Sequence, residues 1–115
     1  MRIWNYQDFM NCRIMRLIVF FDLPMITNKD LAEYRNFRRF LIKNGFIMMQ
    51  ESIYSRLVLN NNSGNLLKKQ IYKNLPSSGL VQLLQVTEKQ YASIEYLRGE
   101  SKSNIIDSND RVVTL

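Results

Sequence analysis

The sequence predicts an α+β domain in which strands and helices alternate along the chain. Short apolar runs rich in β-branched and aromatic residues begin near residues 16, 46 and 80, and this pattern is typical of strands. Two stretches between them, residues 29–44 and 65–74, repeat apolar residues at helical spacing. The length of 115 residues is typical of one domain.

Residues 1–14 share no periodicity with the rest of the chain, and Met15 stands directly before the first strand, residues 16–21. We interpret these 14 residues as an extension, either disordered or included by a start codon placed too early. Residues 15–115 are then the single domain. The first strand is apolar without alternation and ends on a charge, Asp22, before a proline turn.

The first helix is expected at residues 29–44, with Thr27 or Asn28 as its N-cap. Arg38 lies close to its apolar side, and the charge of Arg38 requires a partner, for which Asp22 is one candidate. Its apolar residues are spaced by three, three and four positions and form one inward stripe: Leu31, Tyr34, Phe37 and Leu41.

Residues 46–59 are strand-like but interrupted near Gln50 and Glu51, which indicates two strands or one bent strand. A cluster of turn-forming residues at 60–64 precedes the second helix, at residues 65–74.

The remaining elements are short. Residues 80–86 are expected to form a strand, followed by a helical turn at 86–91. Further strands are expected at residues 93–97 and 111–115.

The order strand-helix-strand-strand-helix-strand, with an additional C-terminal strand, predicts a ferredoxin-like sandwich with both helices on one face of an antiparallel sheet. The other face of such a sheet is normally wet, and its strands then alternate. Residues 16–21 do not alternate and residues 80–86 do so poorly, so both faces are expected to be covered. A second copy is the simplest cover, which predicts a two-fold homodimer packed through the sheets.

Composition excludes several classes of protein. The chain has no histidine, which rules out histidine-based triads and nearly all zinc sites. A single cysteine, Cys12, cannot form an internal disulfide, so a reducing, cytoplasmic location is expected. No run approaches the roughly 20 apolar residues of a membrane helix, and no secretory signal is recognisable, so no membrane partner is expected.

Positive charge is concentrated in the middle of the chain. The net charge is +6, and residues 31–75 hold eight basic residues against two acidic ones. Such a region suggests a polyanion partner, most commonly a nucleic acid. The alternative is a solvated surface, and composition leaves both interpretations open.

Asp22 is the main candidate for chemistry. One carboxylate is a poor site for Mg²⁺, which usually takes one or two carboxylates with water or phosphate oxygens. A two-fold axis would place two copies of Asp22 near one cleft, where metal-bound water could attack a phosphodiester without histidine. The alternative, which the residues alone favour, is that Asp22 accepts turn hydrogen bonds before Leu23 and Pro24.

Four segments together resemble the small CRISPR-associated adaptation protein: FFDLP, YRNFRRFLIKNGFIMMQESIY, NLPSSGLVQLLQVTEKQ and IIDSNDRVVTL. This family is known as a CRISPR endoribonuclease and as a partner of the CRISPR integrase. The match covers residues 15–115 in order and is closest to the branch found with single-effector, RNA-guided DNA-cleaving systems. The resemblance implies a ferredoxin-like homodimer, and it implies that Asp22 is the aspartate that binds Mg²⁺ between two subunits and supports nuclease activity.

The resemblance further implies a role in spacer acquisition, in which the dimer lies between two integrase dimers and supports the incoming double-stranded DNA. Single-stranded RNA is a second candidate partner, and the substrate of the nuclease could be RNA or DNA. Scaffolding is the expected biological function, because nuclease activity occurs in some members of the family and is dispensable for acquisition in at least some systems. The last strand, with Val112, Val113 and Leu115, would serve dimerisation or integrase docking.

Both roles call for basic residues. The expected nucleic-acid contacts lie on the two helices, and solvated helix surfaces are the alternative: Arg35, Arg39, Lys43, Lys68, Lys69 and Lys73. A ferredoxin-like RNA-binding module, or a toxin-like ribonuclease without an integrase partner, is the alternative function.

Overall fold

A computed structural model of the protein describes residues 14–100. The elements follow the order strand, helix, strand, strand, helix, strand, helix: β1 (Met15–Asp22), α2 (Asn28–Lys43), β2 (Ile47–Gln50), β3 (Ile53–Val58), α3 (Asn61–Lys73), β4 (Leu80–Thr87) and α4 (Glu88–Ala92). The predicted alternation of elements is therefore confirmed for this part of the chain. The last predicted strand, residues 111–115, lies outside the described residues, as do residues 1–13.

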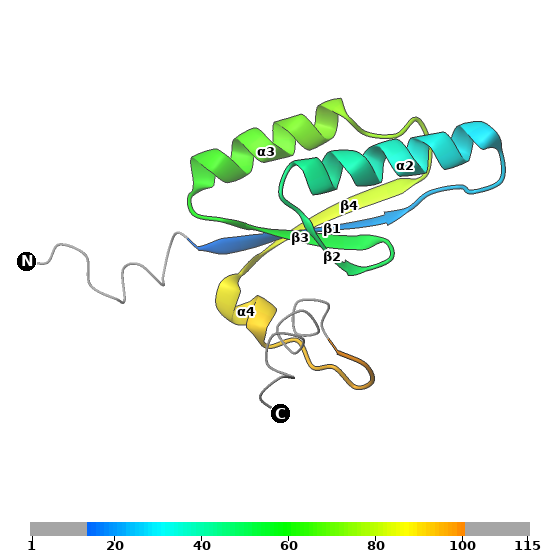
Figure 1. Cartoon of the computed structure of the whole chain (residues 1–115). Coiled ribbons are helices and arrows are strands. Elements are labelled where there is room, and N and C mark those ends of the chain that lie inside the picture. The colour runs from blue at the N-terminus through cyan, green and yellow to red at the C-terminus, as the bar shows by residue number, and fades with distance from the viewer. Residues whose placement is uncertain (1–13, 101–115) are drawn as a thin grey trace, which may run out of the picture.

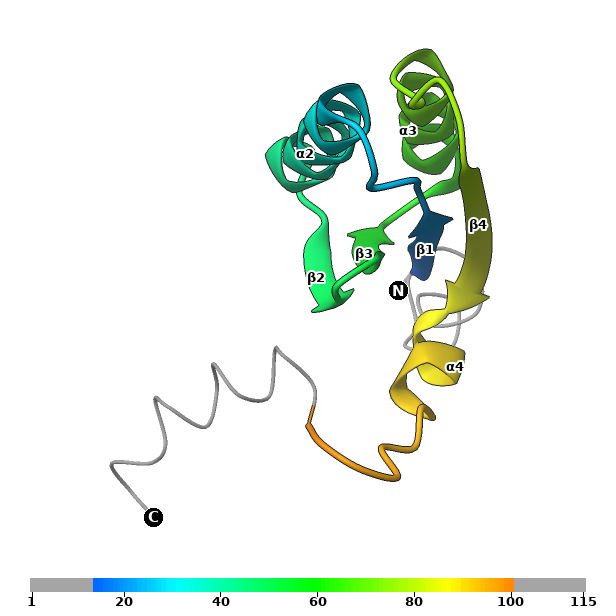
Figure 2. The ribbon, with the colours of Figure 1, turned by 90° about the vertical axis from the view of Figure 1, so that its right-hand side faces the viewer.

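The four strands form one antiparallel sheet in the order β2-β3-β1-β4. Helices α2 and α3 lie side by side on one face of this sheet, and α4 lies on the other side (Figures 1 and 2). This α+β arrangement is compatible with the predicted ferredoxin-like sandwich. None of the helices among residues 14–100 is long and apolar enough to cross a membrane.

The hydrophobic core lies between the sheet and helices α2 and α3. Alternate residues of β1, namely Leu17, Val19 and Phe21, face the helices, because successive side chains of a strand point to opposite faces. They pack against Phe37 and Leu41 of α2, which confirms the inner part of the predicted stripe. Residues of the other elements complete this core: Phe46, Tyr54, Val58, Leu67 and Ile71.

The N-terminus of α2 is fixed by a capping box. The Thr27 hydroxyl accepts a hydrogen bond from the Asp30 N–H at 3.0 Å, and the Asp30 carboxylate accepts one from the Thr27 N–H at 3.0 Å. These bonds satisfy backbone donors that have no partner inside the helix. Of the two predicted caps, the structure thus selects Thr27.

Helix α3 begins at Asn61, four residues before its predicted start, because the turn-forming residues serve as its cap. The Asn60 side chain accepts a hydrogen bond from the Ser63 N–H at 2.8 Å. Gly64 is buried inside the helix, and a Cβ added there would lie 3.8 Å from Val58 of β3. Asparagine, serine and glycine favour both turns and helix caps, which explains the wrong boundary.

The strand predicted at residues 93–97 is wrong. After α4 ends, the Ser93 hydroxyl donates to the Gln90 carbonyl at 2.6 Å, and the Ile94 N–H donates to the Tyr91 carbonyl at 3.2 Å. These groups close the helix, and residues 93–97 continue as a turn and irregular chain. Ile94 and Leu97 line a cleft together with Met49 of β2.

The face of the sheet opposite the helices, here called the open face, carries the other set of alternate residues. The side chains of Leu80 and Leu84 of β4 are 54% and 50% exposed to solvent. Their strand neighbours on the same face are Asp22 and Ile18 of β1. The remaining apolar residues of the open face come from β1, β2, β3 and β4: Phe20, Ile47, Ile53, Leu57 and Val86.

Side-chain contacts with Arg16 hold helix α4 at one end of the open face. The Arg16 guanidinium donates to both carboxylate oxygens of Glu88, at 2.6 and 3.0 Å, and lies 4.1 Å from the centre of the Tyr91 ring. Bidentate pairing and contact with an aromatic face both favour arginine. Arg16 is near the start of β1, so α4 is held at the end of this strand away from Asp22.

Candidate active site and nucleic-acid interface

Asp22 is the last residue of β1, a central strand of the sheet, and its side chain is exposed. It lies on the open face, where it pairs with Leu80, the first residue of β4. The position of Asp22 at a strand end is thus confirmed.

A cleft of about 350 Å³ opens beside Asp22 at this end of the sheet. Its second carboxylate is Glu51, from the turn between β2 and β3, and its amides come from Gln50 and Gln82. The other lining residues are mostly apolar: Phe20, Phe21, Ser52, Ile53 and Leu80. Among residues 14–100, neither lysine nor arginine lines the cleft, so the fixed charges that these residues bring to it are negative.

Glu51 was not predicted as a site residue, although a signal for it existed. The interruption at Gln50 and Glu51 is a hairpin turn between β2 and β3. Because β3 runs antiparallel to β1, β3 begins where β1 ends, and this turn lies beside Asp22.

The hairpin turn is held in place by its backbone. The Phe21 N–H donates to the Ser52 carbonyl at 3.0 Å, and the Tyr34 hydroxyl donates to the Glu51 carbonyl at 3.1 Å. The rings of Phe21 and Tyr34 meet edge to face with centres 5.8 Å apart. Helix α2 therefore supports the wall of the cleft opposite Asp22.

The expected pairing of Arg38 with Asp22 is wrong. The Arg38 Nε donates instead to the Tyr54 hydroxyl at 2.8 Å. Tyr54 is fully buried, and burial raises the pKa of its phenol, so the neutral hydroxyl persists and needs a partner. Arg38 supplies that partner from the edge of the helix.

The oxygen donors beside Asp22 suit Mg²⁺ in kind. Carboxylates, amide carbonyls and a hydroxyl are hard ligands, and Mg²⁺ commonly binds one or two carboxylates while keeping several waters. Among residues 14–100, no group of three or more cysteine, aspartate or glutamate side chains could enclose a metal. Asp22 and Glu51 are the residues of one chain that could hold Mg²⁺, with further oxygens from water, phosphate or a second copy.

The six predicted nucleic-acid contacts lie on the helix layer, away from Asp22. Five of these side chains are exposed, Lys68 is half-buried, and none lines the Asp22 cleft: Arg35, Arg39 and Lys43 on α2, and Lys68, Lys69 and Lys73 on α3. The structure thus separates the basic surface from the acidic cleft. The predicted partner-binding residues Val112, Val113 and Leu115 lie outside the described part of the chain.

The strand order and the acidic strand end define a small α+β protein, compatible with a ferredoxin-like fold, with a candidate hard-metal site. The family model of the CRISPR associated protein Cas2 matches residues 15–94. The chain belongs to this family.

Several curated proteins are similar over most of their length. "CRISPR-associated endoribonuclease Cas2" of Treponema denticola is 52% identical over 101 residues, which is 88% of this chain and 100% of that protein. The protein of the same name from Streptococcus mutans is 45% identical, covering 88% of this chain and 93% of its own length. The one from Ligilactobacillus salivarius is 44% identical, covering 88% and 100%.

Proposed function

We propose that this chain is a CRISPR adaptation subunit, a homodimer that binds double-stranded DNA and scaffolds the integrase. We further propose that Asp22 is the centre of a Mg²⁺-dependent endoribonuclease site. The observation that carries the proposal is the exposed apolar strip of the open face, which ends at Asp22. The relatives named endoribonucleases support the nuclease half of the proposal.

The proposed dimer is supported by the exposed apolar residues of the open face. Leu80 and Leu84 are half exposed, and burying apolar surface of this kind drives association. A second copy packed about a two-fold axis would cover the leucines and bring a second Asp22 to the same end of the sheet.

The nuclease requires a cation because the cleft is acidic. A phosphodiester would be repelled by Asp22 and Glu51 in the absence of a bridging positive charge. Bound Mg²⁺ supplies charge neutralisation and a reactive water at neutral pH. Asp22 and Glu51 would hold the ion, and the amides of Gln50 and Gln82 would orient the RNA strand through hydrogen bonds.

The scaffold uses the helix layer. Duplex DNA contacts the outward basic residues of α2 and α3, including Arg39, Lys43, Lys69 and Lys73. Backbone contacts carry little sequence preference, and log affinity falls with log salt at about −0.9 per phosphate neutralised. Because these residues lie away from Asp22, binding and cleavage should be separable by mutation.

Co-purification with the integrase tests the proposal. Wild type, Asp22→Ala and a deletion of residues 112–115 are each expressed with the integrase from the same locus. Asp22→Ala should retain the integrase and spacer capture but lose Mg²⁺-stimulated RNA cleavage, whereas the deletion should lose the integrase. RNA cleavage by a wild-type chain that never retains an integrase would favour the RNA-binding module or toxin-like ribonuclease instead.

A further inference from the structure

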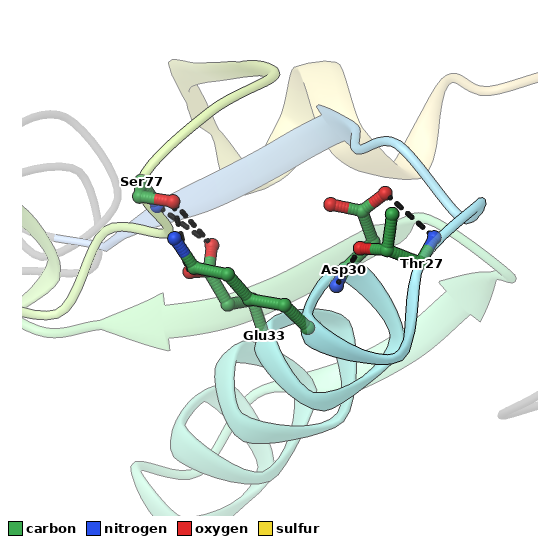
Figure 3. Close-up of polar contacts among 5 residues, drawn as sticks. Thr27, Asp30, Glu33 and Ser77 are labelled. Carbon is green, nitrogen blue, oxygen red and sulfur yellow. Dashed lines mark hydrogen bonds and ion pairs between the residues drawn. The ribbon is translucent and has the colours of Figure 1, made fainter.

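The first two turns of α2 contact two separate segments of the chain. On one side, its capping box fixes Thr27, five residues after Asp22, through Asp30. On the other side, Glu33 accepts hydrogen bonds from Ser77, 44 residues away, at 2.8 Å from the N–H and 2.8–2.9 Å from the hydroxyl. Figure 3 shows both contacts at the same end of the helix.

Ser77 belongs to a loop, residues 76–79, that lies directly against the candidate site. Gly79 has a φ of +96°, and a Cβ added to it would lie 2.8 Å from both the Asp22 carbonyl oxygen and the Leu23 side chain. The next residue, Leu80, pairs with Asp22 and lines the cleft. The loop therefore connects Ser77 to Leu80 and to the backbone of Asp22.

We propose that Glu33 is a positioning residue for Asp22, because it holds the loop that sets the ends of β1 and β4 around the cleft. Glu33 does not line the cleft, so it acts only through Ser77 and the loop. The inference rests on the proposed function, because it takes Asp22 as the reactive centre. Removing partners that orient a site residue typically costs about 10- to 100-fold in activity or metal affinity.

Three variants and a control test this role in the full chain. Glu33→Ala removes both acceptor oxygens, Ser77→Ala removes only the hydroxyl, and Glu33→Gln keeps an acceptor for the Ser77 N–H. The control is Lys29→Gln, because the Lys29 Nζ lies 4.0 Å from the Glu33 Oε2 but Lys29 does not contribute to the hydrogen bonds between Glu33 and Ser77. Each protein is measured for thermal midpoint, for backbone order by nitrogen-15 relaxation and for Mg²⁺-dependent RNA cleavage.

We expect Glu33→Ala to lower the order parameters of Asp22 and Leu80 and to reduce kcat about 10- to 100-fold with little change in KM. Ser77→Ala should fall between it and wild type, Glu33→Gln should recover most of the loss, and Lys29→Gln should match wild type. A merely structural role would instead lower the thermal midpoint and leave kcat and the order of Asp22 unchanged in the folded fraction.

Two outcomes would overturn the inference. The first is that folded Glu33→Ala keeps the wild-type backbone order parameters at Asp22 and Leu80. If Glu33→Ala does not fold, the same result in Ser77→Ala would overturn the inference. The second is a kcat loss in Glu33→Gln as large as in Glu33→Ala. If the wild-type chain cleaves no RNA, the nuclease proposal fails, and the order parameters alone still decide whether Glu33 fixes the ends of the strands.

Discussion

The two faces of the four-stranded sheet are formed by the same strands but differ in how far their side chains are buried. Leu17, Val19 and Phe21 of β1 are buried under α2 and α3, so this face is completed by the chain itself. On the open face, Leu80 and Leu84 of β4 stay half exposed. One face is therefore completed within the chain, whereas the other leaves leucines exposed, as the proposed dimer requires.

The charges follow the same division. The basic residues of α2 and α3 project from the helix layer, whereas Asp22 and Glu51 line a cleft at the end of the sheet. A scaffold needs positive charge and shape, and a nuclease needs a cation beside its carboxylates. One small domain can carry both because the two requirements are met on different surfaces.

The largest effect is expected in the helix-covered face. Phe37→Ala should lower the free energy of unfolding by about 3–5 kcal/mol, because it leaves a cavity beside Phe21, whose ring centre is 5.3 Å away. Urea denaturation measures the change. Tyr72→Ala, at an exposed aromatic residue of α3, is the control and should stay within about 0.5 kcal/mol of wild type. Similar losses for both variants would contradict the assignment of Phe37 to the core between the sheet and the helices.

The open face should instead control association. Leu84→Asp should weaken the dimer by about 100-fold or more, because an unpaired carboxylate is costly to bury. Sedimentation velocity over a concentration series measures the effect. Leu66→Asp is the matched control, since Leu66 is also an exposed leucine, at 62% against 50% for Leu84, but lies on α3. A Leu84→Asp protein that remains as dimeric as Leu66→Asp would rule out this interface.

A smaller effect is expected at the start of α2. Thr27→Ala should cost about 1 kcal/mol of unfolding free energy, because it removes the acceptor for the Asp30 N–H. Thr27→Ser keeps a hydroxyl and should remain close to wild type. Equal losses in the two variants, measured by urea denaturation, would show that the cap does not contribute through its oxygen.

The smallest effect is a dependence of stability on pH. Hydrogen bonds from Ser77 lower the pKa of Glu33 from its ordinary 4.5, and those from Thr27 and Ile26 lower the pKa of Asp30 from 3.8. Lowered values mean that the ionised carboxylates stabilise the fold above these ordinary values and that this contribution is lost as the pH falls below them. Urea midpoints from pH 6 to pH 3 should therefore fall more steeply for wild type than for Glu33→Gln. Parallel curves would contradict this assignment.

Local patterns in the sequence predicted most elements and misplaced a few. The inner part of the stripe in α2, the strand end at Asp22 and the interruption of residues 46–59 near Gln50 and Glu51 were predicted and are confirmed. The strand at residues 93–97 was wrong because its backbone groups close α4 rather than extend the sheet. The homodimer and the role of Asp22 stay predictions.

The sequence by itself determined the kinds of elements, their order and the carboxylate at the end of β1, because periodicity and turn chemistry act between neighbouring residues. Only the tertiary structure decided that Glu51 shares the cleft of Asp22, that the basic residues lie elsewhere, and that Glu33 meets Ser77 from 44 residues away. Contacts between distant residues depend on how the helices and the sheet pack, and no local pattern records that packing.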